Sequence, residues 1–198
     1  MELGSGGGFI KDIIPGIVTS DMILGHGIDL NFSALRIPFR DGAVGAFVMF
    51  NVMHHIPDSR VFLSEAGRCL APGGRIIMIE PANSLFGRFI YRNFHHEPFL
   101  PKAGWSFDSA GPLSSANGAL PWIVFCRDRK TFETEYPQFR IDRIKFHTPF
   151  RYLLSGGFTL KQLLPSFLSP ASRWIEALLS PLNPFLGMFM TVQLTRMK

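Results

Sequence analysis

The sequence predicts an α/β fold in which a doubly wound, mostly parallel sheet ends in an antiparallel strand. Residues 45–52 and 75–80 are almost unbroken apolar runs, and a helical pattern separates them. Apolar runs without alternation indicate strands that are buried on both faces, as in a parallel sheet covered by helices. The third observation is a glycine-rich turn at residues 4–8, because such turns join a strand to a helix beside a ligand.

The helix between the two runs completes a strand–helix–strand unit. Its mostly apolar stripe recurs with helical spacing and consists of Val61, Phe62, Glu65, Ala66, Cys69 and Leu70. Asp58 is the expected N-cap, and Pro72-Gly73-Gly74 is expected to stop the helix. A unit of this kind places its two strands parallel, with a right-handed crossover.

Five further elements complete the predicted fold. Apolar and capping patterns predict strands at residues 17–21, 139–147 and 190–197, and helices at residues 85–94 and from Ser169-Pro170 onward. Residues 82–137 are otherwise irregular and rich in Pro, Gly, Ser and aromatic residues, which indicates an insertion or lid. We therefore divide the single domain into residues 1–81, residues 82–138 and a closing part, residues 139–198.

Composition limits the class of protein. With 198 residues, 46% hydrophobic and 18% charged, the chain is globular and suits one domain. Its two cysteines lack metal or redox spacing, and its start lacks a signal-peptide pattern, so we expect a cytoplasmic protein. Twenty phenylalanines indicate a large apolar core or an apolar ligand surface.

The positive charge is concentrated in the second half. Residues 1–80 hold six Lys and Arg against eight Asp and Glu, whereas residues 81–198 hold fourteen against seven. This excess predicts a solvated basic face, a site for a phosphate-bearing substrate or peripheral contact with an anionic membrane. Residues 177–195 carry no charge, but Pro181 and Pro184 interrupt them, so we expect no membrane span there.

The glycine-rich turn fits one of three known nucleotide-binding patterns. A P-loop would end in Gly-Lys-Ser/Thr, which is absent after Gly8. A dinucleotide fingerprint that starts at Gly4 would need a small residue where Phe9 stands. The third pattern is an acid, one residue and then G-x-G-x-G, and Glu2, Gly4, Gly6 and Gly8 match each fixed position.

This third pattern resembles the first motif of class I S-adenosylmethionine-dependent methyltransferases. Ser33-Ala34-Leu35-Arg36-Ile37-Pro38-Phe39 is similar to the D-A-x-x-L-P-F segment of that family, and Leu70-Ala71-Pro72-Gly73-Gly74 is similar to its L-x-P-G-G turn. Asn51-Val52-Met53-His54-His55-Ile56 resembles the segment after its fourth strand. The small bacterial "type 11" members are the most similar subgroup, and the resemblance covers residues 1–81.

The resemblance implies that S-adenosylmethionine is the cofactor and that residues 1–81 bind it. Asp21 closes the second predicted strand, where the family's acid accepts hydrogen bonds from the ribose hydroxyls. Ser33 stands where the family has an Asp beside the adenine, which removes a charged acceptor. The implied cofactor contacts are Glu2, Gly4, Ser5, Gly6, Gly8, Asp21, Met22, Ser33, Ala34 and Asn51.

Two histidine-containing segments are candidates for chemistry on the acceptor. His54 and His55 lie where the carboxyl edge of the sheet opens to substrate, so either is a candidate general base. His95-His96-Glu97 is a second candidate for the base. A metal site there would need a further ligand at a suitable spacing, and none is obvious, so we expect no metal. No Asn/Asp-Pro-Pro-Tyr/Phe or Pro-Cys segment follows the strand at 45–52, which argues against a nucleic-acid acceptor.

We therefore expect methyl transfer to a small-molecule, lipid or sugar acceptor, with acceptor contacts in residues 82–138. Two alternatives stay open: a non-catalytic module of the same fold that binds a nucleotide-like ligand or a protein partner, and an NAD-dependent oxidoreductase, which Phe9 disfavours. The sequence begins almost on the first motif, with Met1–Leu3 available for the first strand. We accordingly expect an N-terminally shortened member of the family that is a poor enzyme by itself.

Overall fold

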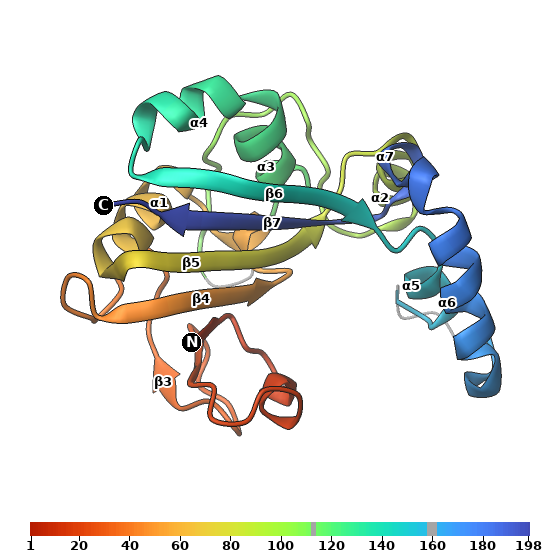
Figure 1. Ribbon diagram of the computed structural model, residues 1–198, viewed down its shortest axis with the longest axis horizontal. Helices are drawn as coiled ribbons and strands as arrows, with labels where there is room; N and C mark the ends of the chain where they lie inside the picture. The colour runs from red at the N-terminus through yellow and green to blue at the C-terminus, as the bar shows by residue number, and fades with distance from the viewer. Residues whose placement is uncertain (112–113, 158–161) are drawn as a thin grey trace.

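The computed structural model describes residues 1–111, 114–157 and 162–198, and it confirms the predicted α/β fold. Its seven-stranded sheet has the order β3-β2-β1-β4-β5-β7-β6 (Figure 1). The strands are β1 (Glu2–Leu3), β2 (Thr19–Asp21), β3 (Leu30–Asn31), β4 (Val44–Phe50), β5 (Leu70–Pro81), β6 (Phe139–His147) and β7 (Phe189–Arg196). Neighbouring strands from β3 to β5 pair parallel, whereas β7 is antiparallel to both β5 and β6.

The helix between β4 and β5 is α1 (Ser59–Cys69), which ends one residue before the predicted stripe does. As predicted, Asp58 caps it, because the Asp58 carboxylate accepts from the backbone N–H groups of Arg60 and Val61. The segment Pro72-Gly73-Gly74 lies within β5, where we had expected a turn outside the strand. Pairing with β4 passes directly from Leu70 to Arg75, so the intervening residues form a bulge.

Two other helices follow the predictions, and one of them starts one residue earlier than expected. Helix α2 (Leu85–Phe94) has the predicted bounds, and the Ser84 side chain caps it by accepting from the Gly87 N–H. Helix α6 (Ser169–Leu178) begins at Ser169, so Leu168 is its N-cap where we had expected Ser169. The Ser169 carbonyl instead accepts from the Ser172 hydroxyl.

Residues 120–135 are helical, although we expected irregular structure there. They form α3 (Leu120–Trp122), a π turn at Ile123–Arg127 and α4 (Arg129–Glu135). The Phe132 side chain is fully buried, and its ring lies 6.4 Å from that of Phe139 on β6. Burial of this apolar segment against the sheet stabilises the helical turns in spite of Gly118 and Pro121 at their start.

The N-terminal third differs most from the sequence-based expectation. The turn after Gly8 leads into a 3₁₀ turn at Phe9–Asp12, where a helix was expected. Strand β3 was not predicted, and β2 is shorter than predicted at its start. Strand β4 ends at Phe50, two residues early, because Asn51 adopts a left-handed φ of 56°.

The parallel strands of the sheet end on the same side of the molecule. Strands β4 and β5 point to the end of the sheet where α5 (Arg151–Leu154) and α6 lie, and β7 runs in the opposite direction (Figure 1). Helix α7 (Asn183–Leu186) leads into β7. In the three described ranges, no helix has the length and apolar character that a bilayer span requires.

Candidate functional site

A cavity of about 530 Å³ lies at the carboxyl ends of β1, β2 and β4, and we call it the glycine-loop cavity. Its volume falls within the range of about 300–1,000 Å³ that is typical of small-molecule sites. Its wall includes seven of the residues predicted from the sequence: Gly4, Gly6, Asp21, Met22, Ser33, Ala34 and Asn51. The structure therefore brings together residues from four separate segments of the first half of the chain.

The glycine loop has a backbone that only glycine adopts readily. Gly4 and Gly6 have φ angles of 68° and 54°. A Cβ on Gly4 would lie 2.5 Å from Val52, so this glycine allows close packing under the cavity. A Cβ on Gly6 would meet no atom within 4 Å, so this glycine leaves space open beside the cavity wall.

Asp21 closes β2 beside the loop. One of its carboxylate oxygens accepts from the Gly6 N–H and the other from the Ile23 N–H, each over 2.9 Å. Each oxygen keeps a further lone pair for a ligand hydroxyl. The Oδ1 atom of Asn51 is buried and has no hydrogen-bond partner within the described part of the chain, so it is a second acceptor at this cavity.

Three predicted cofactor contacts lie behind the wall of this cavity. Glu2 and Ser5 are buried, and the Ser5 hydroxyl accepts from the Ser20 N–H. Burial raises the pKa of Glu2 above its ordinary value. Gly8 packs against the backbone of Gly27 with a φ of 70°. The contact of these residues with a cofactor stays a prediction.

The two adjacent histidines differ in their surroundings. His55 lines the glycine-loop cavity, whereas His54 is buried and does not. The Nδ1–H of His54 donates to Glu80 over 2.6 Å, and the other Glu80 oxygen accepts from the Val52 and Met53 N–H groups. The sequence analysis missed Glu80, although its position at the end of a buried strand places it at the ligand edge.

Glu97 joins the two histidines, and this contact was also missed. Its carboxylate oxygens lie 3.3 Å from Nε2 of His54 and 3.5 Å from Nε2 of His55. The sequence analysis grouped Glu97 with its neighbours His95 and His96 only. The structure adds His54 and His55 to this group, while Glu97 also lies 3.8 Å from Nδ1 of His95 and 3.7 Å from Nε2 of His96, which is 84% exposed.

The charges of this cluster follow from its burial and its close contacts. Burial by itself would lower the pKa of His54, but Glu80 and Glu97 outweigh it and raise that pKa to about 9. Burial would raise the pKa of Glu97, but the surrounding histidines, His54 first, lower it to about 2. Burial, and then the charge of His54, lowers the pKa of His55. His55 is therefore an uncharged imidazole at neutral pH.

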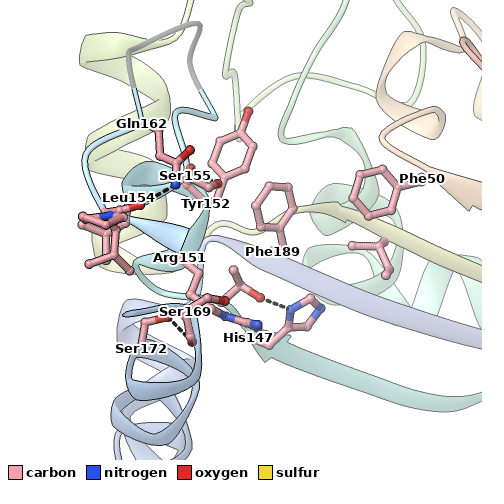
Figure 2. A pocket seen from close by; sticks show the side chains of 14 residues that line it. Phe50, His147, Arg151, Tyr152, Leu154, Ser155, Gln162, Ser169, Ser172 and Phe189 are labelled. Carbon is pink, nitrogen blue, oxygen red and sulfur yellow. Dashed lines mark hydrogen bonds between the residues drawn. The ribbon is translucent and has the colours of Figure 1, made fainter. Parts of the chain in front are cut away.

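A second cavity, of about 700 Å³, lies farther along the same edge, and we call it the apolar cavity (Figure 2). Carbon atoms form most of its surface, with Phe50, Ile79, Tyr152, Leu154, Leu164 and Phe189 among its lining residues. Its arginine and its histidine bond to other groups of the protein. Arg151 pairs with Glu176, and His147 lies within hydrogen-bonding distance of Thr148 and Thr191.

The two cavities share the end of β4. Phe50 lines the apolar cavity, and the next residue, Asn51, lines the glycine-loop cavity. Residues 82–138, where we expected acceptor contacts, contribute Ser109 and Gly111 to the glycine-loop cavity. The described wall of the apolar cavity comes instead from the strand ends and from residues 147–189.

Comparison with known proteins agrees with this geometry. Residues 20–78 match the model of the methyltransferase domain family. A demethylmenaquinone methyltransferase from Thermus thermophilus is 35% identical over 83 residues, which are 38% of this chain and 37% of that relative. The chain thus spans well under half the length of this relative.

Solved structures share the fold over nearly the whole chain. A SAM-dependent methyltransferase from Archaeoglobus fulgidus superposes with a TM-score of 0.56 at 15% identity, covering 98% of this chain and 84% of that one. A SAM-dependent methyltransferase from Thermotoga maritima gives a TM-score of 0.55 at 15% identity, covering 98% and 80%. At these identities the likeness shows the fold alone.

Glu80 offers a direct test of the site's construction. Glu80→Ala leaves two backbone N–H groups and the His54 imidazolium without their buried acceptor, so the free energy of unfolding should fall by about 3–5 kcal/mol. Urea denaturation measures this change. The control is Glu133→Ala, which removes an exposed partner of Arg129 and should unfold like the unchanged protein. Equal stability of the two variants would contradict the arrangement described.

Proposed function

We propose that this chain is a class I S-adenosylmethionine-dependent methyltransferase, which binds S-adenosylmethionine in the glycine-loop cavity and transfers the methyl group to a small, apolar acceptor. The observation that carries the proposal is the convergence of Gly6, Asp21 and Asn51 on one cavity beside a second, apolar one. When bound, the cofactor supplies a methyl group already activated on a sulfonium. The protein therefore contributes positioning above all.

The residues of the glycine-loop cavity fit this cofactor. Gly6 leaves room for a ligand against the backbone, and Asp21 and Asn51 offer acceptors for hydroxyl and amino donors. The apolar part of the wall includes Ala34 and Leu35, which suit a flat purine ring. These contacts support the predicted ribose role of Asp21 and the predicted adenine position beside Ser33 and Ala34.

The apolar cavity is the proposed acceptor site. Its polar side chains Arg151 and His147 are engaged by other groups of the protein, so a ligand there would meet mostly carbon atoms. It adjoins the proposed cofactor site at Phe50 and Asn51, which suits transfer from one to the other. A relative named demethylmenaquinone methyltransferase supports a small-molecule acceptor.

The surface around this cavity supports an acceptor of lipid-like character. Helix α6 exposes Trp174, Ile175 and Leu178, at 74%, 55% and 80%. Its one acidic residue, Glu176, is buried and paired with Arg151. An exposed apolar face with a tryptophan and no free acid suits the interface of a membrane. Peripheral membrane contact through the basic C-terminal half is therefore part of the proposal.

We propose that His55 is the general base that takes a proton from the reacting atom of the acceptor. It lies on the cavity wall and is uncharged at neutral pH, because burial lowers its pKa. His54 does not line either cavity, and its ring is fixed by Glu80 and faces Glu97. We therefore propose that His54 is a positioning residue, where the sequence analysis treated both histidines as candidate bases.

Asp21→Ala tests the cofactor site. Removal of the carboxylate takes away a charged acceptor for two hydroxyls, so the binding free energy of S-adenosylhomocysteine should weaken by about 1.5–3 kcal/mol. Isothermal titration calorimetry measures the affinity. Asp12→Ala is the control, because Asp12 is exposed in the following 3₁₀ turn and lies outside the cavity wall. Unchanged affinity in Asp21→Ala would remove Asp21 from the site.

A pair of glycine variants separates ligand contact from backbone strain. Gly6 and Gly42 both have left-handed φ angles, 54° and 66°, and a Cβ on either meets no protein atom within 4 Å. Gly6→Ala and Gly42→Ala should therefore lose similar stability, about 1–2 kcal/mol each. Only Gly6→Ala should weaken binding of S-adenosylmethionine, measured by calorimetry. Equal affinities in the two variants would show that the cofactor does not approach Gly6.

Phe50→Ala tests the acceptor site. The ring of Phe50 is 43% exposed and contacts that of Phe9 edge to face, so its loss should leave the fold intact. With demethylmenaquinone as acceptor, KM should rise about tenfold, because an aromatic wall is lost. Phe89→Ala is the control, since Phe89 is 55% exposed and contacts Phe94 in the same manner away from both cavities. A changed cofactor affinity with unchanged KM in Phe50→Ala would place the acceptor elsewhere.

A further inference from the structure

Three side chains that could ligate a metal ion meet beside the glycine-loop cavity. His54, His55 and Glu97 each offer one ligand atom, and these atoms all lie within 4.8 Å of one another. They come from the segment after β4 and from the segment after α2, which the fold brings together. We propose that these three residues bind a divalent transition-metal cation, and that Zn²⁺ is the cation their geometry fits.

Two distances within the cluster are those expected between ligands of one metal ion, and each runs to a different oxygen of Glu97. Zn²⁺ binds imidazole nitrogen and carboxylate oxygen at about 2.0–2.2 Å in a tetrahedron, which sets its ligand atoms about 3.3–3.5 Å apart. The Glu97 oxygens lie 3.3 Å from Nε2 of His54 and 3.5 Å from Nε2 of His55. A direct charged hydrogen bond would be shorter, about 2.7–2.9 Å.

The surroundings of His54 are those of a metal ligand. Metal-binding histidines usually donate their second ring N–H to a carboxylate, which fixes the ring and its tautomer. Nδ1 of His54 donates to the fully buried Glu80 over 2.6 Å, and this directs Nε2 toward Glu97. Glu80 is itself held by two backbone N–H groups, so the ligand is positioned before a cation arrives.

The cluster is accessible and leaves a coordination position open. The side chains of His55 and Glu97 are each 21% exposed, which provides a route for the cation. Three protein ligands leave a fourth position, as in catalytic zinc sites. His55 lines the glycine-loop cavity, so the open position suits an acceptor oxygen that reaches into this cavity; with the cation bound, the cation would lower the pKa of that oxygen in place of the His55 imidazole acting as a base. This last role rests on the proposed methyl transfer, whereas binding of the cation does not.

The donor set also predicts which cations bind. Two imidazole nitrogens and one carboxylate suit Zn²⁺ and its transition-metal neighbours, because Mg²⁺ requires oxygen ligands in an octahedron. Chelator-treated, tag-free protein of the full sequence should therefore bind one Zn²⁺ per chain in calorimetric titration and show no heat with MgCl₂. Co²⁺ should produce the strong visible absorption of a tetrahedral site.

Variants identify the ligands. His55→Gln and Glu97→Gln should each weaken Zn²⁺ affinity at least about tenfold and reduce the Co²⁺ absorption. His96→Gln is the matched control, because the His96 ring is 84% exposed and outside the three-residue cluster, although its Nε2 lies 3.7 Å from a Glu97 oxygen. This control should bind like the unchanged chain. Circular dichroism should confirm that all three variants keep the fold.

Clear outcomes would overturn the metal site. They are the absence of stoichiometric Zn²⁺ binding, affinity unchanged in both ligand variants, or an equal loss in His96→Gln. Titration of the metal-free protein with S-adenosylmethionine is performed separately. Cofactor binding without Zn²⁺ binding would reject the metal site and keep the proposed function. Zn²⁺ binding without cofactor binding would keep the metal site and reject the proposed function.

Discussion

The buried carboxylate of Glu80, at the end of β5, sets the geometry of the edge on which both cavities depend. It accepts the backbone N–H groups of Val52 and Met53, so it fixes the course of the chain as that chain leaves β4. It also holds the ring of His54. A carboxylate buried in this way is tolerated only when its acceptors are filled, so the turn, the histidine and the strand end are mutually dependent.

The end of β4 therefore separates two neighbouring cavities with different chemical character. On one side of the β4 end, Asn51 turns with a left-handed φ and joins Gly6 and Asp21 in a cavity with open polar acceptors. On the other side, Phe50 opens onto a cavity whose arginine is neutralised by Glu176. One residue of chain therefore separates a site suited to a polar, hydroxyl-bearing ligand from one suited to an apolar ligand.

The sequence predicted those parts of the fold that local patterns determine. The runs that became β4 and β5, the Asp58 cap of α1 and the bounds of α2 and β6 each depend on residues close together in the chain. Strand β3 has two residues and exists only through pairing with β2, so no local pattern reveals it. The helical turns at 120–135 depend on burial against the sheet, which turn-forming residues nearby conceal.

In the candidate site, too, local patterns predicted some residues and missed those that meet through long-range contacts. Gly4, Gly6 and Asp21 could be identified because their spacing is local and characteristic. The partnership of Glu97 with His54 and His55 could not, since it joins distant segments through the packing of the loop after α2. A sequence pattern records which residues can ligate or accept a proton, whereas the fold decides which of them meet. His54 is the clearest case, because burial beside Glu80 makes it a fixed ring that points at Glu97 and leaves the cavity wall to His55.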